Sequence, residues 1–231
     1  MDTTPYQELA KAKLGGEFKN LDLLITALTH RSYLNEHRST VKEHNERLEF
    51  LGDAVLELVV TEFLYGNYSE PEGILTNWRS SLVRTESIGA AAQRLGFEPL
   101  LRLSRGEKRG TERARAQILA NSFEAVTGAI YLERGYDAAK WFITENILST
   151  FDDILKSGSW MDPKSHLQEV VQSQGGSTPQ YKVLSEEGPD HDKVFSVGVF
   201  VDGEQKGQGT GPSKQAAQVA AATDALQQYH A

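Results

Sequence analysis

Residues 45–60 read NERLEFLGDAVLELVV, a helical pattern in which three carboxylates fall into register. Glu46, Glu49 and Asp53 are spaced i, i+3 and i+7, so at about 100° per residue they share one narrow stripe of a helix. The apolar residues expected on the opposite side are Leu48, Leu51, Val55, Leu58 and Val59. The stretch therefore predicts a helix that packs one face into a core and gathers its acids on the other.

The acidic stripe indicates a metal site. Three crowded carboxylates repel one another, and a hard divalent cation relieves that repulsion. The alternative is a solvated polar face, which is what most acidic helix faces are. Phe50 argues against this alternative because it lies on the acidic side, where an exposed aromatic ring calls for a partner surface.

Further motifs lie on both sides of this stretch. The sequence LLITALTHRSYLNEH occupies residues 23–37, PEGILTNWRSSLVR residues 71–84, and ILANSFEAVTGAIYLERGY residues 118–136. With ERLEFLGD at Glu46–Asp53, these segments resemble in order and spacing the ribonuclease III family of double-stranded-RNA endonucleases. The C-terminal part resembles the double-stranded-RNA-binding domain of that family, so the resemblance covers nearly the whole chain.

Composition agrees with two modest domains. The chain has 231 residues, 39% of them hydrophobic, which is enough apolar material for two cores. It has no cysteine, which excludes disulfides and thiolate chemistry. The N-terminal residues show no basic region followed by an apolar run, and no stretch approaches the roughly 20 apolar residues of a membrane span. We expect a cytoplasmic protein with no membrane partner.

The net charge of −8 is unusual for a protein that binds nucleic acid. Residues 1–161 carry 19 basic and 23 acidic side chains, and residues 162–231 carry 5 and 9. Positive charge is concentrated between Arg102 and Arg115, where Arg105, Lys108 and Arg109 are expected to contact RNA phosphates. The alternative is an ordinary solvated loop.

Hydrophobic periodicity predicts an all-α domain over residues 1–156. Apolar residues recur at helical spacing in 21–34, 48–64, 75–95 and 118–132, and no run alternates long enough to favour a sheet. A linker over residues 157–161 follows, rich in glycine and serine.

A small α+β domain is predicted over residues 162–231. A helix over 165–174 precedes three strands in PQYKVLSEE, KVFSVGVFVDG and EQKGQGTG, with a turn at Asp202 and Gly203. Ser213 then caps a helix that runs to about Tyr229. This α-β-β-β-α order is the architecture of a double-stranded-RNA-binding domain.

A second helix should complete the metal site, because three acids on one helix cannot enclose an ion. Asn121 and Glu124 lie one turn apart, and by resemblance they complete the acidic cluster of the family. The expected metal ligands are Glu49, Asp53, Asn121 and Glu124, with Mg²⁺ as the cofactor and Mn²⁺ as a possible substitute. The expected catalytic residues are Glu46, Asp53, Glu72 and Glu124. Of these, Glu46 and Glu72 are expected in the outer part of the site.

Asn121 departs from the family, which often has Asp there. An amide oxygen still ligates a hard cation but brings no charge, so weaker metal affinity is expected at this position. The resemblance implies hydrolysis to 5′-phosphate and 3′-hydroxyl ends with two-nucleotide 3′ overhangs, in the processing of ribosomal and other RNA. The alternative is a double-stranded-RNA-binding protein whose cleavage is reduced or lost through Asn121; retention of the other acids favours the nuclease.

The resemblance also implies the contacts with partners. The RNA-binding residues expected in the C-terminal domain are Ser165, Gln168, Glu169, Gln172, His191, Ser213 and Lys214. The family usually has two or three basic residues at the start of the last helix, but here Gln215 and Gln218 accompany Lys214, so weak autonomous binding is expected. Phe50 is expected to insert into a second copy of the chain in a homodimer; the alternative is packing near Leu21 or Leu24 of its own chain.

Overall fold

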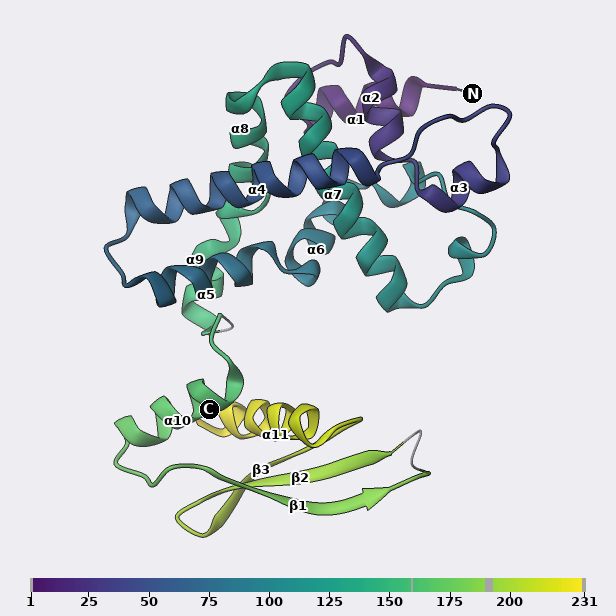
Figure 1. Ribbon diagram of the computed structural model, residues 1–231. Helices are drawn as coiled ribbons and strands as arrows, with labels where there is room; N and C mark the ends of the chain where they lie inside the picture. Colours follow the sequence, from purple (N-terminus) through teal and green to yellow (C-terminus); the bar gives the residue numbers. More distant parts are fainter. Residues whose placement is uncertain (1, 159, 190–192, 230–231) are drawn as a thin grey trace. The chain divides into compact units, whose positions relative to one another are not determined.

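The computed structural model describes residues 2–158, 160–189 and 193–229, and its internal contacts divide the chain into two compact units, Met1–Ile154 and Leu155–Ala231. The N-terminal unit is helical (Figure 1), as predicted; in its described residues the only β-type pairing outside a strand is an isolated bridge between Thr29 and Arg102. Its α-helices, with α9 crossing the division, are α1 Thr4–Lys13, α2 Leu21–Ala27, α3 Arg31–Glu36, α4 Glu46–Asn67, α5 Glu72–Val83, α6 Thr85–Leu95, α7 Glu112–Arg134, α8 Tyr136–Asn146 and α9 Phe151–Ser157. Short 3₁₀ turns occupy Glu98–Leu100, Glu107–Arg109 and Leu148–Thr150.

Helices α4 and α7 cross at the centre of this unit and form its most extensive helix pair (Figure 1). Two glycines make the crossing close. A Cβ atom on Gly52 would lie 1.7 Å from the carbonyl oxygen of Glu124, and a Cβ atom on Gly128 would lie 2.3 Å from that of Leu48. Any larger residue at either position would therefore force the two backbones apart.

Two predicted helices are each divided in the structure. Residues 21–34 form α2 and α3, because Thr29 leaves the helix to pair with Arg102 and His30 then caps α3 by accepting a hydrogen bond from the Ser32 backbone N–H. Residues 75–95 form α5 and α6, because Arg84 adopts an extended conformation (φ −64°, ψ 152°). Periodicity could not reveal these breaks, since the apolar spacing continues across them.

Burial along α4 differs from the prediction at two positions. Leu48, Val55 and Val59 are buried as expected, but Leu51 is only half-buried and Leu58 is 56% exposed. The buried side of the helix is instead completed by Leu56, Val60 and Leu64, and α4 as a whole packs against α5, α7 and α8. The core face is therefore rotated relative to the predicted one, and Leu58 joins Phe50 on a surface that the unit leaves open. Within the described residues no helix combines enough length with enough apolar character to cross a bilayer.

The C-terminal unit has the predicted helix, three strands and helix. The elements are α10 Pro163–Ser173, β1 Gln180–Glu187, β2 Val194–Val201, β3 Glu204–Gly211 and α11 Lys214–Tyr229. The strands form an antiparallel sheet in the order β1-β2-β3. Asp202 and Gly203, both with positive φ, make the turn between β2 and β3, and the Ser213 hydroxyl caps α11 by accepting from the Ala216 backbone N–H.

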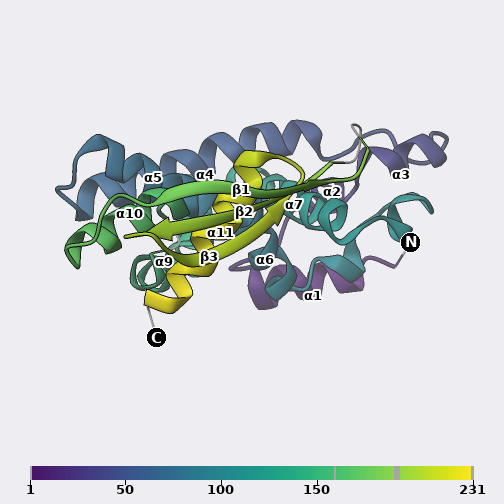
Figure 2. The same cartoon turned by 90° about the horizontal axis from the view of Figure 1, so that it is seen from below.

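Helix α11 packs on one face of the sheet, against β3 and β2 (Figure 2). Val197, Val199 and Val201 of β2 point to this face and are buried with Leu167 and Val171 of α10. The alanines of α11 allow a close approach to β3: a Cβ atom on Gly209 would lie 2.2 Å from the backbone nitrogen of Ala221. The sheet and its two helices thus share one small apolar core.

Candidate metal centre and RNA-binding residues

Four of the predicted site residues are brought together by the crossing of α4 and α7. Glu49 and Asp53 lie on α4, on either side of Gly52, and Asn121 and Glu124 lie on α7. Because the backbone of Glu124 is what a Gly52 side chain would strike, the two halves of the cluster meet at the closest point of the two helices.

Burial and the neighbouring carboxylates shift the pKa values of Glu124 and Glu49. Burial, then the neighbouring charges of Asp53 and Glu49, raise the pKa of Glu124 from the ordinary 4.5 to about 8. Burial also raises the pKa of Glu49, assisted by Glu46 and Asp53 and opposed by a hydrogen bond with Asn121. Carboxylates held in this way gain from a nearby cation, which favours their ionised form.

The Asn121 side chain is held on both sides. Its amide hydrogen-bonds to Glu49, and its carbonyl oxygen accepts a hydrogen bond of 2.7 Å from Gln117. As it stands, the amide presents its donor to the acidic cluster and its oxygen to Gln117. Rotation of the terminal amide would exchange the two, which would turn the oxygen toward the cluster.

The donor set fits a hard divalent cation, since every side chain in it offers oxygen. In the described part of the chain, no three acidic, histidine or cysteine side chains stand close enough to hold a metal ion as they are. Ligation therefore requires the carboxylates to turn toward one another. Burial and the neighbouring carboxylates raise the pKa of Glu49 and Glu124, so a bound cation would favour their ionised forms.

The two predicted outer residues lie in different places. Glu46 begins α4, is exposed, and contacts Arg31 at 3.5 Å. Glu72 begins α5 and lines a groove between α4 and α5, together with Leu64, Tyr65 and other residues. Glu46 thus borders the cluster, whereas Glu72 is beside the C-terminal part of α4, about three turns beyond Asp53.

An apolar surface runs along α4. Phe50 is 81% exposed, Leu58 56% and Tyr65 82%. The exposure of Phe50 contradicts the alternative in which its ring packs against Leu21 or Leu24 of its own chain. Three large apolar side chains on one exposed helix face are typical of a protein interface.

The basic segment divides into exposed and structural residues. Arg105, Lys108 and Arg109 are exposed, as RNA contacts require. Arg102 donates to the Thr29 hydroxyl and lies over a tyrosine ring, and Arg115 pairs with Glu98. The predicted RNA-contacting residues are therefore accessible, while the charges at both ends of the segment are used within the unit.

In the C-terminal unit the predicted residues of α10 are exposed: Ser165, Gln168, Glu169 and Gln172. Ser213 and Lys214 are exposed at the start of α11, where the Lys214 ammonium pairs with Glu186 of β1 at 2.9 Å. His191 lies outside the described residues. The pairing of Lys214 was not predicted, because strand and helix positions far apart in sequence meet only in the fold.

Sequence reasoning also missed Gly52 and Gly128, whose contacts set the distance between the two halves of the cluster. A signal was present, since a glycine inside a helical pattern costs about 1 kcal/mol relative to alanine and so points to a packing reason.

Comparison with known proteins gives a consistent result over the whole chain. Residues 20–151 match the family model described as Ribonuclease-III-like, and residues 163–229 match the double-stranded RNA binding motif. The chain is 43% identical to Ribonuclease 3 of Latilactobacillus sakei, with 100% of both chains covered, and 44% identical to Ribonuclease 3 of Enterococcus faecalis, with 98% of both covered.

A similar solved structure is the nuclease domain of ribonuclease III from Campylobacter jejuni, with 37% identity and a TM-score of 0.54. It covers 62% of this chain and is itself covered to 98%. That structure is described as showing flexibility in a region involved in dimer formation.

Proposed function

Because the chain belongs to the ribonuclease III family, we propose that it is a divalent-metal-dependent endoribonuclease that hydrolyses double-stranded RNA to 5′-phosphate and 3′-hydroxyl ends with two-nucleotide 3′ overhangs. The observation that carries the proposal is the grouping of Glu124 with Asp53 and Glu49 where α4 and α7 cross, in which burial first, and then the charges of Asp53 and Glu49, raise the pKa of Glu124 to about 8. We place the activity in the cytoplasm, in the processing of ribosomal and other RNA.

The proposed ligands are Glu49, Asp53, Asn121 and Glu124, which would hold Mg²⁺ or, in its place, Mn²⁺. Bound metal ions would supply an activated water and stabilise the charge that develops on the attacking and leaving oxygens. The protein positions these groups: Gly52 and Gly128 set the separation of α4 and α7, and the hydrogen bonds of Asn121 orient Glu49.

The proposed active form is a homodimer through the exposed face of α4. Leu58 lies near the midpoint between Phe50 and Tyr65, each about 11 Å away along the helix. A two-fold axis near Leu58 would run the two copies of α4 antiparallel, so that Phe50 of one copy meets the Tyr65 groove of the other. This groove has a volume of about 480 Å³ and is largely apolar, as a socket for an aromatic ring requires.

In its own chain Glu72 lies about three turns of α4 beyond Asp53, but in the proposed dimer it would lie beside the acidic cluster of the second copy. Glu72 lines the groove beside Tyr65, so in the dimer it would lie close to Phe50 of the second copy and hence to the acidic stripe that includes Glu49 and Asp53. We assign Glu72 to the outer part of the second copy's site. Glu46 keeps the corresponding position in its own chain.

RNA contacts are proposed on both units. Exposed residues of the basic segment would follow phosphates, and the exposed polar side chains of α10 with the start of α11 would contact the minor groove and backbone of a duplex, which proteins recognise mainly by shape. We propose residues 157–161, which begin at the last residue of α9, as the linker between a nuclease domain (1–156) and an RNA-binding domain (162–231).

A cleavage assay with labelled duplex RNA, in Mg²⁺ and in EDTA, tests the proposal. We expect metal-dependent cleavage that Glu124→Gln and Asp53→Ala lower by several orders of magnitude while duplex binding persists. Glu86→Gln removes an exposed carboxylate from α6 and serves as the control. Equal cleavage by the two site variants and the control would refute the assignment, and binding without cleavage by the unmodified protein would favour the binding-only alternative.

A further inference from the structure

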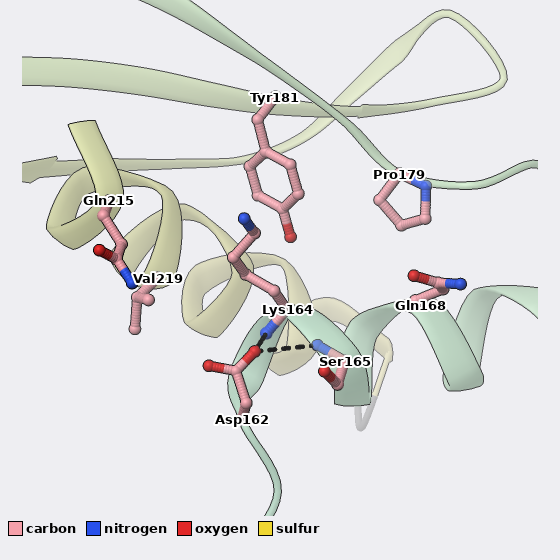
Figure 3. Close-up of a pocket in the computed structure, with 8 residues that line it drawn as sticks. All are labelled: Asp162, Lys164, Ser165, Gln168, Pro179, Tyr181, Gln215 and Val219. Atoms are coloured by element: carbon pink, nitrogen blue, oxygen red, sulfur yellow. Dashed lines mark hydrogen bonds between the residues drawn. The ribbon is translucent and has the colours of Figure 1, made fainter.

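The C-terminal unit contains a hollow of about 310 Å³ between the start of α10, the start of β1 and the start of α11 (Figure 3). Its wall includes Ser165 and Gln168 of α10, which are expected to contact RNA, and Gln215, which follows Lys214. The hollow therefore opens on the surface that the proposed function assigns to the duplex.

Two charged residues, Asp162 and Lys164, line the hollow, and they differ in their hydrogen-bond partners. Asp162 caps α10: one carboxylate oxygen accepts hydrogen bonds from the backbone nitrogens of Lys164 and Ser165 at 3.1 and 3.2 Å. The Lys164 ammonium donates to the Gln218 side-chain oxygen at 2.8 Å and lies 4.9 Å from the centre of the Tyr181 ring. Both partners of the ammonium are neutral, so its charge is not cancelled by contact.

Other lysines of this unit are engaged differently. Lys206 pairs with Glu204 at 2.6 Å and Lys214 with Glu186 at 2.9 Å. Lys182 lies over the Phe200 ring, on the sheet face away from α11. Among the described contacts, only Lys164 brings an ammonium without a carboxylate partner to the RNA-facing side.

The Lys164 ammonium lies beside Gln218, a position at which α11 has no basic residue of its own. Gln218 lies one turn after Lys214, and the Lys164 side chain brings a positive charge from α10 to this turn. Cations one helical turn apart can engage phosphates along one strand of a duplex.

We propose that Lys164 is a phosphate-binding residue of the C-terminal unit, which receives a backbone phosphate of duplex RNA at the hollow beside Gln218. This inference rests on the proposed function, because it takes duplex RNA as the ligand. Ser165 and Gln215 offer a hydroxyl and an amide donor at the same wall. Asp162 opposes the anion, but its carboxylate is already engaged by the backbone of α10.

The test measures the affinity of the full chain for a duplex RNA in EDTA, over a series of salt concentrations. Each lost phosphate contact lowers the slope of log affinity against log salt by about 0.9, which corresponds to about eightfold weaker binding at 0.1 M salt. We expect this loss for Lys164→Gln and recovery in Lys164→Arg, which keeps the charge. Lys182→Gln makes the same charge change on the other sheet face and should leave the slope unchanged.

The outcomes separate this inference from the proposed function. If the unmodified chain does not bind duplex RNA, both fail. If it binds, and Lys214→Gln lowers the slope while Lys164→Gln does not, the role of Lys164 is refuted and RNA binding stands. Equal losses for Lys164→Gln and Lys164→Arg would refute it as well, because they would show a packing role against Tyr181; thermal unfolding of both variants measures that packing.

Discussion

Substitution of Gly52 by alanine tests how the two halves of the acidic site are held together. The added Cβ atom would lie 1.7 Å from the Glu124 carbonyl oxygen and 2.8 Å from the Gly128 nitrogen, whereas ordinary contacts of Cβ atoms begin at 3.4 Å. Both neighbours belong to the backbone of α7, so no side-chain rotation relieves the clash. The two helices must therefore separate locally by more than 1 Å, which is on the order of the difference between the 1.7 Å approach and an ordinary contact of 3.4 Å.

The expected loss of stability is at the upper end for an overpacked core, about 3 kcal/mol. Gly66→Ala is the matched control, because it makes the same change on the same helix at a position with nothing within 4 Å. Without a clash, alanine should stabilise the helix by about 0.5 to 1 kcal/mol. The two variants should therefore differ by about 4 kcal/mol in the free energy of unfolding.

Urea unfolding followed by circular dichroism measures this difference, and calorimetric titration with Mg²⁺ measures the effect on the site. Gly52→Ala should bind the metal more weakly even where it remains folded, because Asp53 and Glu124 have moved apart. Gly128→Ala should behave similarly, since its Cβ atom meets the Leu48 carbonyl oxygen at 2.3 Å. A free energy for Gly52→Ala within 0.5 kcal/mol of that for Gly66→Ala, with equal Mg²⁺ affinity, would refute the reasoning.

Asn121→Asp should lower the Mg²⁺ concentration for half-maximal cleavage, because a carboxylate binds a hard cation more strongly than an amide does; an unchanged Mg²⁺ dependence would place Asn121 outside the metal ligands. Phe50→Ala should give a monomer in sedimentation at micromolar protein, since truncating a buried Phe costs about 3 to 5 kcal/mol, and an unchanged dissociation constant would contradict the interface. The pKa of Glu124 is raised from 4.5 to about 8, so its contribution to stability is complete below about pH 4.5 and is lost as pH rises through about 8. In EDTA the melting temperature should fall over this range in the unmodified protein and less in Glu124→Gln; parallel pH profiles would contradict the coupling.

The sequence predicted those parts of the fold that depend on local periodicity. Three acids at helical spacing and an apolar alternation such as that of Val197 and Val199 specify element type directly, because side-chain direction follows from the backbone period. Helix breaks were missed where the cause is remote: Thr29 leaves its helix through pairing with Arg102, a residue 73 positions away. Local patterns contain no information on such a partner.

The site was predictable in its residues but not in its surroundings. Grouping Glu124 with Asp53 depended on resemblance, and the structure adds the reason, which is the close crossing at Gly52. The exposure of Leu58 was not predictable, because apolar residues at the edge of a helical stripe look the same whether a core or a second copy covers them. The pairing of Lys214 likewise required the fold.

The covalent link between the two units affects the turnover rate of the enzyme. A duplex held by one unit meets the other at an effective concentration on the order of millimolar, far above the bulk protein concentration. An RNA-binding unit in which Lys214 is paired with Glu186 can therefore be occupied, even with weak binding of its own, while the nuclease unit holds the same duplex. Weak intrinsic binding would then speed the departure of the cut ends, a step that limits the rate of many enzymes.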